Sequence, residues 1–157
     1  MRLYFLRHGL AGDPATWTGD DFYRPLTAEG HAKMRREAQT VKKILPRLDL
    51  IVTSPLVRAK QTAQIVADAL NAEKRLVEDE RVGHGFDVTR LSAILEERRD
   101  LATLMLVGHE PSMSQTMGRF LGGAHIALKK GGLARIDIDD PAPPVLVWLL
   151  PPKLLAR

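Results

Sequence analysis

Nearly continuous hydrophobic segments alternate along the chain with segments in which hydrophobic residues recur every three or four positions. The first kind covers residues 2–6, 49–53 and 101–107 and is typical of strands that are buried on both faces of a sheet. The second kind has the period of an amphipathic helix. It predicts helices over residues 28–45 with Thr27 as N-cap, over 57–70, around 88–95 and around 113–121.

The last part of the chain has a different pattern. Residues 133–138 alternate hydrophobic and polar side chains, as a half-exposed strand does, and residues 145–150 are hydrophobic again. The segment 139–144 between them is rich in Asp and Pro and predicts a turn. Alternating strands and helices with a C-terminal antiparallel hairpin predict the α/β class, with three layers (α/β/α) and a mixed, mostly parallel sheet. No repeat or linker divides the sequence, so a single domain over residues 1–157 is expected.

Composition excludes several kinds of chemistry. The 157 residues contain no cysteine, which rules out disulfides, thiolate metal sites and a cysteine nucleophile. The excess of 23 Lys and Arg over 19 Asp and Glu is modest, and the 5% of aromatic residues gives little support to nucleic-acid binding. No hydrophobic segment approaches the roughly 18 to 20 residues needed to cross a bilayer, and the N-terminus lacks a signal-peptide pattern. We therefore expect a cytoplasmic protein without nucleic-acid or membrane partners.

The candidate chemistry lies where the predicted strands end. In open α/β sheets, ligands bind beyond the carboxyl ends of the strands. The first hydrophobic segment is followed by Arg7 and His8, the second by Arg58 one turn into a helix, and the third by His109. Arg presents a planar fork that matches two phosphate oxygens. Two guanidinium groups and two imidazoles at one edge of a sheet therefore predict a site for phosphate or another oxyanion.

The imidazoles add a covalent possibility to anion binding. An imidazole beside a bound phosphoryl group can attack phosphorus in line and form a phosphohistidine, which water then hydrolyses. The two Arg side chains and a second imidazolium, from His109, would stabilise the charge on the equatorial oxygens. A metal ion is not expected, because the sequence contains no His-x-x-x-His or His-x-His pair. No cofactor is expected either.

Three short motifs at these strand ends resemble those of a known family. Leu6-Arg7-His8-Gly9, the segment 54–63 (SPLVRAKQTA) and Val107-Gly108-His109 resemble, in this order, the motifs of the histidine phosphatase superfamily. Arg24-Pro25-Leu26-Thr27, together with Gly30 and the short length of the chain, is similar to the small SixA-type branch, the phosphohistidine phosphatases. The resemblance implies a phosphoglycerate-mutase-like fold and covers nearly the whole chain.

The resemblance also implies a role for each candidate residue. His8 would be the phosphorylated nucleophile, Arg7 and Arg58 would bind phosphate, and His109 would be a further phosphate ligand that also stabilises charge. Larger members have a Glu general acid after the third strand of the sheet. Glu80 is the nearest candidate here, but the local pattern around that Glu is not reproduced.

The weak match of Glu80 to the general acid of larger members favours one substrate class. The leaving nitrogen of a phosphoramidate can be protonated before it departs, so its cleavage depends less on an enzyme acid than ester hydrolysis does. We therefore expect the partner to be a phosphorylated protein, a domain that carries phosphohistidine. Two alternatives stay open: a phosphatase for small phosphate esters, whose pH profile would depend on Glu80, and a phosphoprotein-binding module without turnover.

The irregular segment 10–25 is long enough to be functional. Its aromatic residues Trp17, Phe22 and Tyr23 are expected to pack the loop against the body of the protein. Arg24, before Pro25, is interpreted as the start of the following helix rather than as a phosphate ligand.

Overall fold

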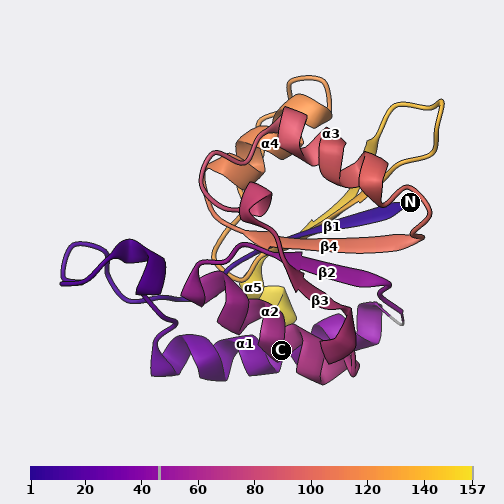
Figure 1. Cartoon of the computed structure of the whole chain (residues 1–157). Helices are drawn as coiled ribbons and strands as arrows, with labels where there is room; N and C mark the ends of the chain where they lie inside the picture. The colour runs from indigo at the N-terminus through magenta and orange to yellow at the C-terminus, as the bar shows by residue number, and fades with distance from the viewer. Residues whose placement is uncertain (46, 157) are drawn as a thin grey trace.

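Helices cover both faces of a six-stranded sheet in the computed structural model of the chain, which describes residues 1–45 and 47–156 (Figure 1). The strands are β1 (Arg2–Arg7), β2 (Leu50–Thr53), β3 (Leu76–Glu78), β4 (Thr103–Gly108), β5 (Leu133–Asp137) and β6 (Val145–Leu150). The helices are α1 (Ala28–Ile44), α2 (Val57–Leu70), α3 (Val88–Glu97), α4 (Ser112–Phe120) and α5 (Pro152–Leu155), with short 3₁₀ turns η1 (Asp21–Tyr23), η2 (Glu73–Arg75) and η3 (Glu80–Val82).

The strands lie in the order β3-β2-β4-β1-β5-β6. The pairs β1 with β4, β2 with β4 and β2 with β3 are parallel, whereas β5 pairs antiparallel with both β1 and β6. This confirms the predicted three-layer α/β/α class, the mixed and mostly parallel sheet, and the C-terminal antiparallel hairpin. Two elements were not predicted from the sequence: β3, a three-residue strand at the sheet edge, and the short helix α5.

The alternation of side chains along β1 divides the hydrophobic core between the two faces of the sheet. Tyr4 and Leu6 belong to the cluster that contains the buried residues of α1 and α2, and Leu3 and Phe5 to the cluster that contains those of α3 and α4. In Figure 1, α1, α2 and α5 lie on one side of the sheet and α3 and α4 on the other. Burial on both faces explains why the central strands are almost entirely hydrophobic in sequence.

The first turn of α1 is fixed to the segment that follows His8. Thr27 caps the helix by accepting a hydrogen bond from the Gly30 amide (2.9 Å), and the Thr27 amide donates to the Leu10 carbonyl (3.0 Å). A Cβ atom on Gly30 would lie 2.0 Å from that carbonyl oxygen. Only a glycine therefore allows the helix to approach the chain this closely.

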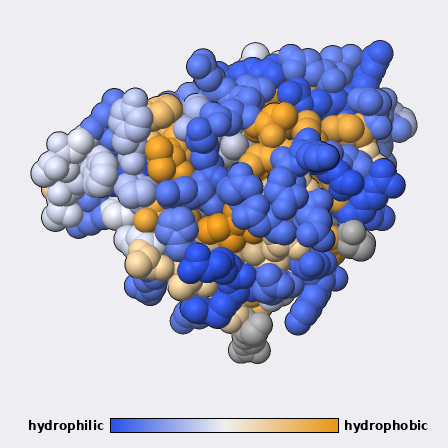
Figure 2. Space-filling view, turned by 60° about the horizontal axis from the view of Figure 1, so that its bottom comes forward, coloured by the Kyte–Doolittle hydropathy of each residue, from blue (hydrophilic) through white to orange (hydrophobic). Residues whose placement is uncertain are grey.

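The surface is mostly hydrophilic, with separate smaller hydrophobic areas, in the view that brings the side of α1 and α2 forward (Figure 2). Among the described residues, no helix is both long and hydrophobic enough to span a membrane.

The close approach at Gly30 predicts that Gly30→Ala destabilises the protein. The added methyl group must displace backbone, so we expect the free energy of unfolding to fall by about 1–3 kcal/mol in urea denaturation. Gly12→Ala is the matched control, because a Cβ atom there meets only the Arg24 side chain at 3.9 Å. Similar stabilities for the two variants would contradict the close packing of α1 on Leu10.

Candidate active site

The parallel pairing of β1 with β4 places two histidines side by side. Arg7 pairs with Gly108 in the register of the two strands, and the His8 amide donates to the Gly108 carbonyl (3.0 Å). His8 and His109 are therefore the next residues of two neighbouring strands that end at the same edge. Their ring centroids are 5.2 Å apart, and each residue is 6% exposed.

The two predicted arginines lie next to these rings. Arg58 is the second residue of α2, which begins just beyond the end of β2, and it is 4% exposed. Arg7 ends β1, and its Nη1 donates to the Leu128 carbonyl (2.9 Å). The positive charges of both arginines are close enough to disfavour protonation of His8. The structure thus brings together all four residues that the sequence predicted for the site.

His8 is held as a neutral imidazole with one nitrogen free. Its Nδ1 lies 2.8 Å from the Gly9 carbonyl oxygen, which can only accept a hydrogen bond, so Nδ1 carries the proton and Nε2 keeps its lone pair. Burial, reinforced by the charges of Arg58 and Arg7, lowers the pKa of His8 to about 3. At neutral pH this ring is therefore uncharged and has a lone pair on Nε2.

The second histidine is held by a serine that the sequence reasoning did not single out for this role. His109 Nε2 lies 2.7 Å from the Ser54 hydroxyl, which also accepts the Leu56 amide hydrogen (3.3 Å). Burial and the neighbouring His8 lower the pKa of His109 to about 3. The ring is therefore neutral in this structure and not the imidazolium expected from the sequence. We assign the Ser54 hydroxyl as donor to Nε2, which leaves the His109 proton on Nδ1.

Buried nitrogen atoms without a partner are concentrated in this cluster. Within the described part of the chain, five buried side-chain polar atoms lack a hydrogen-bond partner, and three of them are Arg7 Nε, Arg58 Nε and His109 Nδ1. The other two belong to the carboxyl group of Glu37. Buried donors are normally paired in folded proteins. The three nitrogens are thus donors suited to an oxyanion bound beside His8.

An aspartate that the sequence did not indicate positions Arg58. Arg58 Nη1 donates to the Asp21 carbonyl and Nη2 to the Asp21 carboxylate, both at 2.8 Å, and Arg24 Nε donates to the other carboxylate oxygen (2.7 Å). Partial burial opposes ionisation of Asp21, but the bond from Arg24 and the charge of Arg58 outweigh it and hold the pKa of Asp21 below its usual value. An Asp in a loop rich in Asp and Gly gives no signal of this contact in sequence.

This aspartate also attaches the long loop to the body of the protein. Tyr23 is 63% exposed and Trp17 is 37% exposed, so the expectation that these aromatic residues pack the loop against the body is wrong for both. Phe22, the third residue of that prediction, is half-buried. The loop is held instead by the ion pairs of Asp21 and by a bond from Arg24 Nη1 to the Gly12 carbonyl. Arg24 is 7% exposed, so these contacts of its side chain are buried within the loop.

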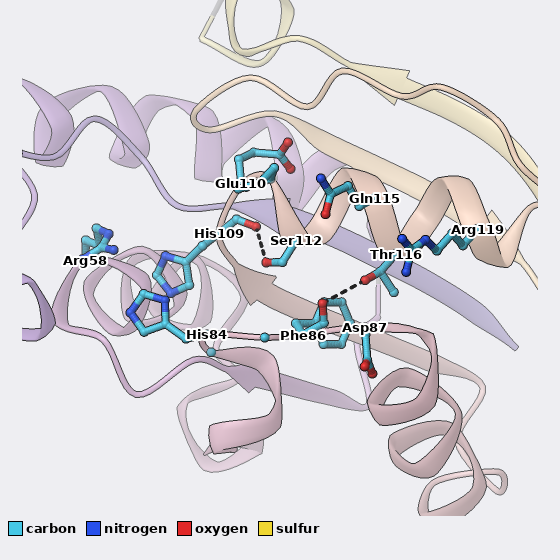
Figure 3. A pocket seen from close by; sticks show the side chains of 13 residues that line it. Arg58, His84, Phe86, Asp87, His109, Glu110, Ser112, Gln115, Thr116 and Arg119 are labelled. Carbon is cyan, nitrogen blue, oxygen red and sulfur yellow. Dashed lines mark hydrogen bonds between the residues drawn. The ribbon is translucent and has the colours of Figure 1, made fainter.

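A cavity of about 390 Å³ opens beside His109 (Figure 3). Arg58, His84 and His109 line one part of it, and residues of α4, among them Gln115 and Arg119, line another. Glu80, the sequence candidate for a general acid, does not line this cavity but a neighbouring groove that shares Gly83 and His84 with it. Among the described residues, no group of three or more His, Asp and Glu side chains is arranged to hold a metal ion.

Comparison with known proteins shows the family to which the chain belongs. A sequence model of the histidine phosphatase superfamily (branch 1) matches residues 3–82, and the chain belongs to this superfamily. An uncharacterized protein of Picosynechococcus is 36% identical over 85% of this chain and 82% of its own length. The phosphohistidine phosphatase SixA of Escherichia coli is 24% identical over 97% of this chain and 94% of its own.

Solved structures share the fold at lower sequence identity. A protein histidine phosphatase SixA complexed with tungstate superposes with a TM-score of 0.88 over 99% of both chains at 24% identity. The alpha-ribazole phosphatase of Shigella flexneri superposes with a TM-score of 0.76 over 97% of both chains at 20% identity. The predicted phosphoglycerate-mutase-like fold and the SixA-type resemblance are confirmed.

The low pKa of His8 predicts how stability changes with pH. Below its ordinary pKa of 6.5 the imidazole is protonated in the unfolded chain but not in the folded one, so the free energy of unfolding decreases as pH falls from 6.5 toward 3. This contribution has a slope of up to about 1.4 kcal/mol per pH unit. His109, whose pKa is also lowered, decreases the free energy of unfolding in the same way as pH falls. Glu37, whose pKa burial raises to about 7, has the opposite effect and increases the free energy of unfolding as pH falls below 7.

We therefore expect His8→Gln to lose less stability than the wild-type protein between about pH 6 and pH 5, because one of these contributions is removed. Urea denaturation at several pH values measures the slope. His125→Gln, at an exposed position outside the site, controls for the loss of an imidazole. Parallel slopes for His8→Gln and the wild type would contradict the neutral, buried state of His8.

Proposed function

We propose that this protein is a metal-independent phosphohydrolase that takes a phosphoryl group onto His8, hydrolyses the resulting phosphohistidine, and acts on phosphohistidine in another protein. One observation carries the proposal. Three buried N–H donors without partners, on Arg7, Arg58 and His109, belong to residues that neighbour an imidazole whose Nε2 lone pair is free. Donors that need an anion beside a neutral nucleophile fit covalent phosphoryl transfer better than binding alone.

The first step forms a bond between His8 Nε2 and phosphorus. The bond from phosphorus to the leaving group breaks at the same time, and the leaving atom keeps the electron pair and takes a proton. The hydrogen bond from Nδ1 to the Gly9 carbonyl keeps the His8 ring oriented and stabilises the positive charge that the ring acquires. In the second step, water attacks phosphorus, the bond to Nε2 breaks, and phosphate is released.

The arginines and His109 stabilise the charge of the transition state. Their unpartnered N–H groups are in place before the substrate binds, so little reorganisation is needed during the reaction. A phosphoryl dianion next to His109 favours the protonated ring, because a nearby opposite charge favours the charged form. The imidazolium expected from the sequence is then a property of the complex with substrate.

The proposed substrate class depends on the general acid, for which this chain has no clear counterpart to the Glu of larger family members. Glu80 lines the groove next to the cavity and not the cavity of His109 itself. A phosphoramidate depends less on such an acid, because its leaving nitrogen can accept a proton beforehand. SixA of Escherichia coli is a phosphohistidine phosphatase by name, and it aligns with nearly the whole chain. The cytoplasmic location and the lack of nucleic-acid and membrane partners stay predictions of the sequence.

The cavity of about 390 Å³ favours a second candidate function, hydrolysis of a small phosphate ester. It is large enough for a small leaving group, and a phosphatase for a small molecule has the same fold. The covalent chemistry on His8 would be unchanged. A phosphoprotein-binding module without turnover, the third possibility, leaves the free Nε2 of His8 without a role.

We expect His8→Ala to abolish turnover while the protein remains folded. Covalent catalysis should contribute at least about a thousandfold, so residual activity above about a thousandth of the wild type would remove His8 from the nucleophile role. In the wild type, brief reaction with ³²P-labelled substrate should leave acid-labile label on His8. His125→Ala is the matched control and should label and turn over normally. A protein that binds the substrate but never carries label is a binding module.

The substrate is tested by comparing kcat/KM for a phosphohistidine protein, free phosphohistidine, a sugar phosphate and an aryl phosphate. We expect the phosphohistidine protein to be preferred over both esters by at least about a hundredfold, because its leaving nitrogen can be protonated before it departs. Comparison with free phosphohistidine measures how much the protein part of the substrate adds. Equal or faster ester hydrolysis would overturn the protein substrate and support the small-ester alternative, with the phosphatase class unchanged.

A further inference from the structure

His84 is an imidazole at the site to which the proposed reaction gives no role. It lies in the short segment between η3 and α3, and its ring stacks on that of His109 with centroids 6.2 Å apart and an interplanar angle of 19°. Figure 3 shows the two rings together on the side of the cavity that faces Arg58. His109 therefore contacts the ring of His84 as well as that of His8.

The backbone of this segment is anchored on both sides of His84. Arg90 Nη1 donates to the His84 carbonyl (2.7 Å), and the Gly83 amide donates to the Glu80 carbonyl (3.0 Å). Gly85 turns the chain with a φ of +74°, which favours glycine, and the following Phe86 is buried in the core against Phe5. These contacts fix the position from which the exposed ring enters the cavity.

The carboxyl groups of the cavity are already engaged. Glu110 accepts hydrogen bonds from the amide (3.0 Å) and the hydroxyl of Ser114, and Asp87 caps α3 by accepting from the Arg90 amide (2.9 Å). The His84 ring, in contrast, makes no hydrogen bond to any residue that the structure describes. The cavity and the groove that meet at His84 contain other charged and titratable side chains. They are Arg58 of α2, Glu80 and Arg81 of η3, Asp87 just before α3, Arg90 within α3, His109 just after β4, and Glu110 just before α4.

We propose that His84 transfers the proton in both steps of the reaction: it protonates the leaving atom when the phosphoryl group moves to His8, and it then removes a proton from the attacking water. The inference rests on the proposed covalent function. It assigns to His84 the role of general acid for which Glu80 was the sequence candidate. Imidazole suits both directions, because it exchanges a proton near neutral pH more readily than other side chains. After one turnover His84 has regained its proton, and phosphate and the protonated leaving group have formed.

The place of His84 matches the direction of the reaction. In-line attack by His8 expels the leaving group on the opposite side of phosphorus, and water enters later from that same side. The cavity that receives a leaving group is lined by His84, Arg58 and His109, and His8 does not line it. A single imidazole in that cavity can therefore act as acid toward the leaving group and as base toward water.

The two steps make different demands on His84. Good leaving groups and phosphoramidates need little help in the first step, but water needs a base in the second step whatever the substrate was. Loss of His84 should therefore slow hydrolysis of the phosphoenzyme for all substrates. It should slow formation of the phosphoenzyme only for substrates with poor leaving groups.

The experiment compares wild-type protein with His84→Gln and the matched control His125→Gln in quenched-flow assays. A series of aryl phosphates with increasingly basic leaving phenols is the substrate set. For His84→Gln we expect kcat to fall by about 10²-fold or more. We also expect ³²P label to accumulate on His8 with good leaving groups, and the rate of label formation to depend more steeply on phenol basicity. The limb of the pH profile that depends on the proton carrier should be lost, whereas His125→Gln should behave like the wild type.

Each outcome separates this inference from the proposed function. If wild-type protein carries label on His8 and His84→Gln matches it in kcat, labelling and pH profile, His84 is not the proton carrier and the covalent function stands. If the pH limb is lost in Glu110→Gln or Glu80→Gln instead, the proton passes through that carboxyl group. If the wild type never carries label on His8, the proposed function itself fails. Thermal unfolding and a second variant, His84→Asn, distinguish a chemical effect from misfolding, and both variants must agree.

Discussion

The parallel pairing of β1 with β4 is the constraint on which the whole site depends. Parallel neighbours end at the same edge of a sheet, so a register that pairs Arg7 with Gly108 necessarily brings His8 next to His109. On the other side of β4, β2 ends level with them and delivers Ser54 and, one turn later, Arg58. A shift of one residue in either register would turn these side chains to the opposite face.

Burial gives these residues their chemistry, and it also costs stability. The low polarity around His8 keeps its ring neutral and its Nε2 reactive, while the same surroundings leave three N–H donors without partners. A buried donor without a partner costs about 1–3 kcal/mol, a cost that a bound anion accepting its hydrogen would remove. The hydrophobic clusters on the two faces of the sheet, with strands such as β4 fully buried, offset that cost. The hydrophobic core thus stabilises a fold whose site is arranged for an anion before the anion binds.

The sequence allowed most of the fold and the four central residues to be predicted, because both follow from local patterns. Helix α2 matches its prediction at both ends, and Thr27 caps α1 as expected. The edge strand β3 was missed, since three residues, two of them exposed, give no periodicity. Asp21 and the stacking of His84 on His109 were missed because loop contacts between distant segments leave no pattern along the chain.

The ion pair between Asp21 and Arg58 has a consequence for the order of the long loop. The same guanidinium group holds the loop through Nη1 and Nη2 and has its unpartnered Nε in the site, so the Asp21 carboxylate and an oxyanion bound at Nε act on one side chain. Occupancy of the site and attachment of the loop are then thermodynamically linked, and the coupling must be equal in both directions. Whatever protein or molecule stabilises the loop in its attached form will, to the same extent, alter the affinity of the site for phosphate.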